Sequence, residues 1–217
     1  MNTAKLIHDT ILFVKQTLAD AEGGHDWFHI ERVYKNALLI AKSESCDTLV
    51  VQLGALLHDI ADSKFHGGDE TIGPRTARNF LESQHVAEEV IVHVVQIIEN
   101  ISFKGGKTKR KFSSIELDIV QDADRLDAIG AIGIARAFNY GGFKNRALYN
   151  PKVAPNLKMT KEKYKNSQAP TINHFYEKLL LLADKMNTKT GAAIAIKRHR
   201  YMENFLSQFY AEWEGEI

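Results

Sequence analysis

The sequence predicts an all-α protein, and three observations carry that prediction. Apolar residues recur at steps of three and four along most of the chain, which places them on one face of a helix. No segment alternates β-branched and polar residues strongly enough to compete as a strand. Only four of the 217 residues are proline and 14 are glycine. We expect a compact bundle of eight to ten helices forming a single domain over residues 1–217.

The first half of the chain predicts five helices separated by glycine pairs or short polar segments. Gly23-Gly24 and Gly67-Gly68 interrupt the periodic pattern. The third helix is almost entirely apolar or small at 53–57, which predicts burial on every side. Asp69 is the expected N-cap of the fourth helix. The five expected ranges are 6–18, 26–40, 48–60, 70–81 and 86–101.

The second half begins with a polar, basic loop at 104–111. After it, Ser114 is expected to cap a helix whose Leu117, Val120 and Leu126 side chains face the core. Gly130 and Gly133 open a closely packed stretch that continues to Phe138. Residues 140–170 hold three of the four prolines and predict a long surface excursion. Two final helices are expected at 172–186 and 190–213.

Composition excludes several classes of protein. With 44% hydrophobic and 25% charged residues, the chain is neither disordered nor of low complexity. Its longest apolar run, 128–135, is far shorter than the roughly 20 residues of a membrane span. The single cysteine, Cys46, allows no internal disulfide and suits a reducing compartment. We therefore expect a cytoplasmic protein without membrane contact. A net charge of +1 gives no indication for or against an anionic partner.

Three segments place metal-ligating residue types inside otherwise apolar helical patterns. They are 25–33 (HDWFHIERV), 56–64 (LLHDIADSK) and 120–128 (VQDADRLDA). An ionised carboxylate in an apolar helix is costly unless it is paired or holds a metal. Buried ion pairs explain one or two such placements, but three segments favour a metal site.

The second segment admits two interpretations. His58 could donate to a backbone carbonyl in the core, with Asp59 capping the helix or pairing with Lys64. Alternatively, His58 and Asp59 are metal ligands, while Asp62 and Lys64 supply a spare carboxylate and a cation for phosphate.

The first and third segments also leave alternatives open. His25 and His29 are four residues apart and can share a helix face, but His25 also fits a surface position before the helix. His29 and Arg32 lie together on the helix surface. In the third segment Asp124 and Asp127 share a face while Asp122 points elsewhere, so at most one or two aspartates reach one ion.

The ordered set of His29, His58-Asp59 and Asp124 resembles the H…HD…D signature of the HD-domain metal-dependent phosphohydrolases, in particular the small stand-alone bacterial branch. The run ADRL at 123–126 and HFYEKL at 174–179 also resemble that branch, so the likeness covers about residues 20–210. Core motifs then span about 25–130, and the helices of 171–213 complete the fold.

The resemblance implies an α-helical fold and one divalent metal ion. The implied ligands are His29, His58, Asp59 and Asp124; Asp124 is chosen over Asp122 because the family aspartate precedes Arg-Leu. The donors suit Mn²⁺, Fe²⁺, Zn²⁺ or Mg²⁺, and the sequence does not choose among them. His93 is a candidate ligand for a second ion, but it has no paired histidine nearby in sequence.

The resemblance also assigns roles around the metal. Asp62 matches the position of an acidic residue that orients or deprotonates water, although Ser63 replaces the acidic residue that follows it in related hydrolases. Lys64 is the expected catalytic cation, and Arg32 and Lys178 are the expected substrate-binding cations that neutralise phosphate charge.

The function that follows is hydrolysis of a small phosphate ester by metal-activated water. A nucleoside mono- or triphosphate is the expected substrate, and a nucleoside triphosphate pyrophosphohydrolase is the sharpest form of the hypothesis. Two alternatives remain: a non-catalytic, metal-holding nucleotide sensor, and a nucleic-acid phosphodiesterase that uses the basic loop. Nucleic acid is disfavoured because no aromatic residues interleave that loop, and a homodimer is left open.

Overall fold

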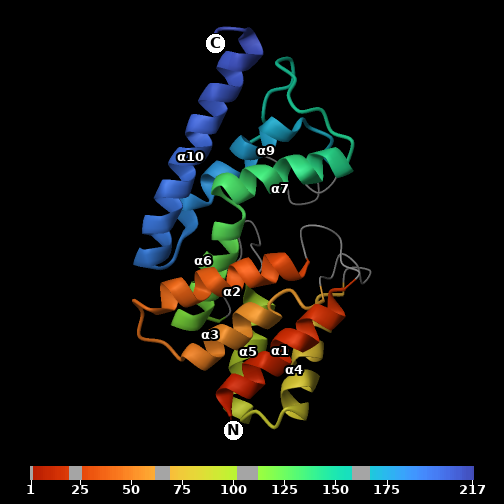
Figure 1. Ribbon diagram of the computed structural model, residues 1–217, viewed down its shortest axis with the longest axis vertical. Helices are drawn as coiled ribbons and strands as arrows, with labels where there is room; N and C mark the ends of the chain where they lie inside the picture. The colour runs from red at the N-terminus through yellow and green to blue at the C-terminus, as the bar shows by residue number, and fades with distance from the viewer. Residues whose placement is uncertain (1, 20–25, 62–68, 102–111, 158–166) are drawn as a thin grey trace. The chain divides into compact units, whose positions relative to one another are not determined.

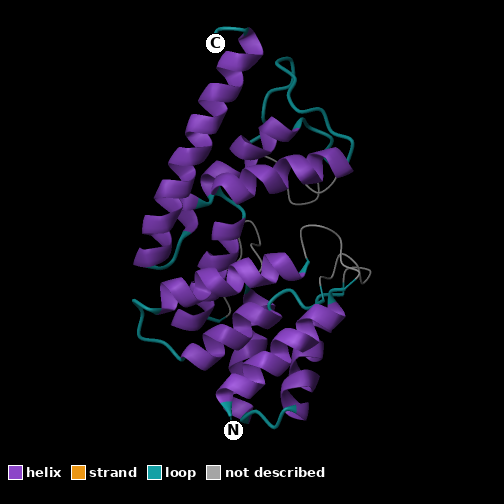
Figure 2. Ribbon diagram, viewed as in Figure 1, coloured by secondary structure: helices purple, strands orange, loops and turns teal. Residues whose placement is uncertain are grey.

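The computed structural model describes residues 2–19, 26–61, 69–101, 112–157 and 167–217. Within these ranges every regular element is helical, with nine α-helices and two short 3₁₀ turns (Figures 1 and 2). The all-α prediction and the expected eight to ten helices are confirmed. The chain divides into two compact units, Met1–Asp124 and Arg125–Ile217. The single domain over 1–217 stays a prediction.

Unit 1 is built around one helix that is buried on nearly all sides. Its helices are α1 (Thr3–Thr17), α2 (Trp27–Ala41), α3 (Thr48–Leu57), α4 (Ile72–Ser83), α5 (Glu88–Asn100) and most of α6 (Ile115–Asp127). Helix α3 contacts α1, α2 and α5, and α4 contacts α5. Seven of the ten residues of α3 are buried, as the apolar sequence of this helix predicts. A Cβ added at Gly54 would lie 3.3 Å from Ile97 Cδ1 and 3.4 Å from Val120 Cγ2, so this glycine permits close packing at the centre of the unit.

Helix capping in unit 1 follows the sequence at one predicted position and departs from it at another. Ser114 Oγ accepts a hydrogen bond from the Leu117 N–H at 3.1 Å, which confirms the expected cap of α6. The prediction that Asp69 caps α4 is wrong. Asp69 Oδ1 instead accepts from the N–H and the hydroxyl of Thr71, at 2.8 and 2.7 Å. The Asp69 carboxylate therefore stabilises a local turn and does not cap the helix, which begins at Ile72.

Unit 2 contains α7 (Gly130–Phe143), α9 (Thr171–Glu177), the 3₁₀ turns Leu179–Leu181 and Ala183–Lys185, and α10 (Lys189–Glu214). Helix α7 contacts both α9 and α10. Aromatic side chains fill the space between these helices: the Phe138 ring lies 6.1 Å from Phe175 and 5.9 Å from Phe205. Gly130 starts α7 with φ +77° beside Arg198, a backbone conformation that favours glycine.

The predicted helix over 172–186 is wrong in its second half. Helix α9 ends at Glu177, and Lys178 leaves helical geometry with φ −145° and ψ −57°. The two 3₁₀ turns that follow still bury Leu179 and Leu182. These leucines are therefore buried although the backbone follows tighter turns than those of an α-helix.

Two other expectations can be placed. Helix α7 extends to Phe143, and no helix occurs in 144–157 or 167–170 of the expected excursion; the basic loop at 104–111 lies outside the described residues. Cys46 is a free cysteine. Among the helices described, none combines the length and apolar character needed to cross a membrane.

Candidate metal centre

Three helices of unit 1 present the histidines and carboxylates that the sequence singles out. His29 lies in the first turn of α2, where Asp26 Oδ1 accepts a hydrogen bond from the His29 N–H at 2.9 Å. His58 is the residue at the C-terminal end of α3, and Asp59 follows it. Asp124 lies on α6. Helices therefore hold His29 and Asp124, while His58 and Asp59 lie in the turn that directly follows α3.

The side chains converge on one point. Donor atoms of His29, His58 and Asp59 all lie within 4.8 Å of one another. The two imidazole rings meet edge to face, with centroids 5.4 Å apart at 68°. Asp124 stands outside that close triplet, but its Oδ1 lies 3.6 Å from His29 Nε2 and 4.0 Å from His58 Nε2. These distances suit separate ligands of a shared cation better than hydrogen bonds between the residues.

His58 provides the test of whether a metal fits. Its Nδ1 lies 2.9 Å from the Ala55 carbonyl oxygen, so Nδ1 carries the proton and donates it. Its Nε2 is buried and has no hydrogen-bond partner among the described residues. The core-histidine alternative is thus correct for one nitrogen and leaves the other unexplained. A backbone carbonyl that holds Nδ1–H leaves the Nε2 lone pair available, which is the usual arrangement of a metal-ligating imidazole.

Burial is uneven across the cluster. His29 and His58 are 2% and 7% exposed, Asp59 is half-buried, and the side chain of Asp124 is 40% exposed. The imidazoles are therefore fixed by the core, while the carboxylate side is accessible. Two imidazoles and two carboxylates suit a borderline or hard divalent ion and leave coordination positions for water or a phosphate oxygen.

The structure separates the three aspartates of the third segment. Asp122 is fully buried and Asp127 forms an ion pair with Arg136 at 2.5 Å. Asp124 Oδ1 lies within 4.0 Å of Nε2 of both imidazoles. Asp124 is also the aspartate that the resemblance implies as the fourth ligand.

The remaining predicted residues are less fully placed. Asp62 and Lys64 lie outside the described residues, as does His25. Arg32 is half-buried on α2, three residues beyond His29. Lys178 belongs to unit 2, at the C-terminal end of α9.

His93, considered for a second ion, has other contacts. Its Nε2 lies 2.9 Å from Ser114 Oγ and 3.4 Å from Glu116 Oε2, and its ring meets Phe112 edge to face. These contacts account for the histidine as part of the packing between α5 and the start of α6.

His174 is a functional candidate to which the sequence assigns no role. Burial, together with the positive charges of Lys178 and Arg146, lowers its pKa to about 3. Histidine and lysine four residues apart share a helix face, and that spacing was the available signal. Because the imidazole is neutral, Lys178 and Arg146 give this region of unit 2 a positive charge that suits an anion.

Comparison with known proteins agrees with this geometry. Residues 27–129 match the HD domain family model, which covers all four converging side chains. The uncharacterised Bacillus subtilis protein YpgQ is 36% identical over 211 residues, covering 94% of this chain and 91% of YpgQ. The chain belongs to the HD-domain family.

Solved structures of related proteins extend the likeness over the whole chain. An HD-superfamily hydrolase from Bacillus thuringiensis has 43% sequence identity and a TM-score of 0.80, covering 98% of this chain and 99% of that protein. The complex of Bacillus subtilis YpgQ with ADP has 34% identity and a TM-score of 0.76, with 98% and 97% coverage. HD domains bind divalent metal ions, and this family supports metal-dependent phosphohydrolysis in general.

Proposed function

We propose that this HD-domain protein hydrolyses a nucleotide, either a nucleoside monophosphate or a nucleoside triphosphate, at the cluster in unit 1. A pyrophosphohydrolase acting on nucleoside triphosphates is the specific form we favour. The observation that carries the proposal is the buried His58 Nε2, which has no hydrogen-bond partner among the described residues and faces Asp124. The binding of ADP by YpgQ supports a nucleotide as the ligand class.

His29, His58, Asp59 and Asp124 are the proposed ligands of one divalent ion, with Mn²⁺, Fe²⁺, Zn²⁺ and Mg²⁺ as the candidates. When bound, such an ion supplies Lewis acidity toward water and a phosphoryl oxygen. The Ala55 carbonyl holds the His58 ring in the tautomer that directs its lone pair into the cluster. The buried imidazoles keep their positions while the exposed side of Asp124 faces incoming substrate.

The sequence assigns further roles in the proposed reaction. Asp62 is the proposed general base, which accepts the proton of the attacking water. Lys64, Arg32 and Lys178 are proposed to neutralise charge on the phosphate oxygens.

Product analysis of a nucleotide panel tests the proposal. Nucleoside mono-, di- and triphosphates of each base are incubated with Mn²⁺, and products are separated by chromatography. Wild type is compared with Asp59→Ala, and with Glu88→Ala as a matched control, because Glu88 is an exposed carboxylate paired with Arg78. We expect a defined product from wild type and Glu88→Ala that disappears in Asp59→Ala. Release of pyrophosphate identifies the pyrophosphohydrolase, and release of phosphate identifies a phosphatase.

The same assay separates the enzyme from a sensor. If the protein binds metal and nucleotide but converts no member of the panel, hydrolysis of nucleotides is contradicted and the sensor takes its place. Cytoplasmic location and a homodimer remain predictions from the sequence.

A further inference from the structure

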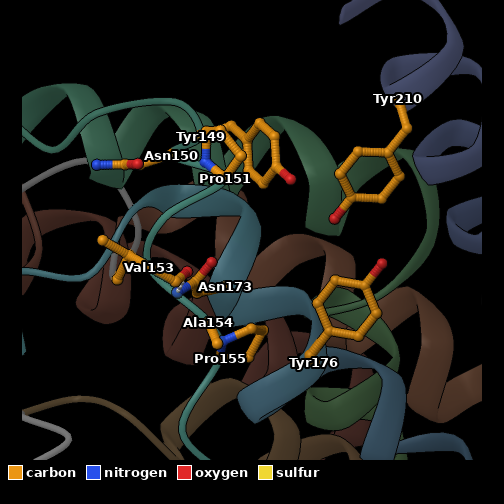
Figure 3. Close-up of a pocket in the computed structure, with 9 residues that line it drawn as sticks. All are labelled: Tyr149, Asn150, Pro151, Val153, Ala154, Pro155, Asn173, Tyr176 and Tyr210. Atoms are coloured by element: carbon orange, nitrogen blue, oxygen red, sulfur yellow. Dashed lines mark hydrogen bonds between the residues drawn. The ribbon is translucent and has the colours of Figure 1, made fainter. Parts of the chain in front are cut away.

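Unit 2 contains a pocket of about 420 Å³ that none of the proposed metal ligands lines (Figure 3). One wall is the loop 149–155, and the other is formed by Asn173 and Tyr176 of α9 with Tyr210 of α10. Its volume falls within the range of sites for small organic ligands. The pocket lies entirely within one compact unit, so its shape depends on that unit alone.

Tyrosines dominate the pocket. Tyr149 and Tyr210 meet edge to face with ring centroids 5.3 Å apart, and the Trp213 ring meets Tyr149 edge to face at 5.1 Å. Figure 3 shows the hydroxyl ends of Tyr149, Tyr176 and Tyr210 directed toward a common space. Burial and a hydrogen bond with Tyr176 raise the pKa of Tyr210, so its hydroxyl remains neutral. Such side chains offer flat aromatic faces together with uncharged polar edges.

One buried polar side chain completes the pocket. Asn173 is 1% exposed, and its Nδ2 donates to the Val153 carbonyl at 3.0 Å, which ties the loop to α9. That bond assigns the amide orientation and identifies Oδ1 as the acceptor atom of the side chain. None of the described residues that line the pocket has a charged side chain. The lining therefore suits a neutral ligand with a hydrogen-bond donor on its edge, and offers nothing to balance a phosphate.

We propose that this pocket is a second ligand site that binds an uncharged nucleobase bearing an amino group, presented as a nucleoside. The tyrosine rings contact the faces of the base, and Asn173 Oδ1 accepts a hydrogen bond from its amino group. Stacking on aromatic side chains is the general means of holding a base, and asparagine carboxamides pair with base edges. Binding needs neither metal nor hydrolysis, so the site stands or falls separately from the proposed function.

Tryptophan fluorescence provides the readout. The chain has two tryptophans, and Trp213 contacts the pocket through Tyr149. In a Trp27→Phe background, with EDTA present to prevent turnover, adenosine is titrated while Trp213 emission is followed. We expect saturable quenching. Purine riboside, which lacks the amino group, is expected to bind about two- to tenfold more weakly, because Asn173 Oδ1 is then left unpaired.

Variants place the site. Tyr176→Ala and Tyr210→Ala are each expected to weaken adenosine binding by at least about fivefold. Tyr201→Ala is the matched control, since Tyr201 is an exposed tyrosine of the same helix as Tyr210 and does not line the pocket. Tyr201→Ala and Asp59→Ala are both expected to bind adenosine as wild type does. Thermal melting checks that each variant is folded.

Three results would overturn the proposal. The first is no saturable quenching by adenosine up to its solubility limit. The second is binding that Asp59→Ala removes and the pocket variants do not, because that places the nucleoside at the metal cluster. The third is equal affinity for adenosine and purine riboside together with stronger binding of tetramethylammonium, which identifies a cation site instead. The ligand comparison uses unmodified pocket residues, so it remains decisive even if a tyrosine variant fails to fold.

Discussion

The metal cluster of unit 1 and the tyrosine pocket of unit 2 differ in what their residues lack. In the cluster, buried imidazoles and carboxylates crowd together, and His58 Nε2 has no hydrogen-bond partner among the described residues. In the pocket the described lining side chains are uncharged, and the buried Asn173 amide donates a hydrogen bond to the loop. Carboxylates beside an imidazole nitrogen without a hydrogen-bond partner indicate a charged ligand, whereas neutral aromatic walls indicate an uncharged ligand with a flat apolar face.

The largest expected effect is loss of turnover when an imidazole of the cluster is removed. His58→Ala should lower turnover of the nucleotide substrate by more than about 100-fold, because it removes a direct ligand rather than an outer contact. Steady-state kinetics measure the effect, and adenosine quenching of Trp213 should be unchanged in the same variant. Substantial residual activity in a folded His58→Ala protein would contradict the assignment of hydrolysis to the metal cluster of unit 1.

The two neighbouring aspartates of α6 should separate metal binding from folding. Asp124→Ala is expected to weaken Mn²⁺ binding by roughly 10–100-fold while leaving thermal stability close to that of wild type. Asp122→Ala is expected to do the reverse, lowering the free energy of unfolding by about 1–3 kcal/mol, because Asp122 is completely buried. Calorimetric metal titration and chemical denaturation measure the two quantities. A metal defect in Asp122→Ala without one in Asp124→Ala would reverse the ligand assignment.

The half-buried His174 of unit 2 predicts a pH dependence of stability that involves no proposed metal ligand. The pKa of His174 falls from 6.5 when unfolded to about 3 when folded. Between these values the unfolded chain binds a proton that the folded chain does not. Stability is therefore complete above pH 6.5 and declines as the pH falls toward 3, by at most about 1.4 kcal/mol per pH unit. Urea denaturation from pH 7 to pH 4.5 should show a shallower decline for His174→Gln, and an unchanged slope would contradict the assignment.

The smallest expected effect concerns the loop that forms one wall of the pocket. Asn173→Ala removes the hydrogen bond to the Val153 carbonyl and is expected to lower the free energy of unfolding by about 1 kcal/mol. Hydrogen exchange in residues 149–155 should become faster while exchange in α3 does not change. Equal protection of the loop in both proteins would show that its position does not depend on Asn173.

Much of the fold could be predicted from the sequence because a helix requires a regular spacing of apolar residues over a short stretch of chain. The apolar stretch of α3 and the Ser114 cap of α6 both depend on residues within one or two turns. The failures are also local. Asp69 could cap α4 or form a local turn, and it forms the turn through hydrogen bonds from Thr71. Around Lys178, the apolar spacing specified which leucines are buried but not the turn geometry that buries them.

The two sites differ more sharply in how well the sequence predicts them. His58 and Asp59 stand out because they directly follow a strongly apolar helical stretch, and the resemblance joined them to His29 and Asp124. Convergence of three helices could not be derived from spacing alone. The pocket gave no signal, because Tyr149, Tyr176 and Tyr210 are common core residues that lie far apart in the chain. Only packing between α9, α10 and the loop brings them together.

The central claim is that one divalent ion, held by His29, His58, Asp59 and Asp124, is required for hydrolysis. The most direct test is calorimetric titration of Mn²⁺ into metal-free protein, with turnover measured at each point for wild type and His58→Ala. We predict one ion bound per wild-type chain, with activity rising in proportion to the bound ion, and neither binding nor activity in His58→Ala. Full activity in metal-free protein, or equal binding of the ion by His58→Ala, would contradict the claim.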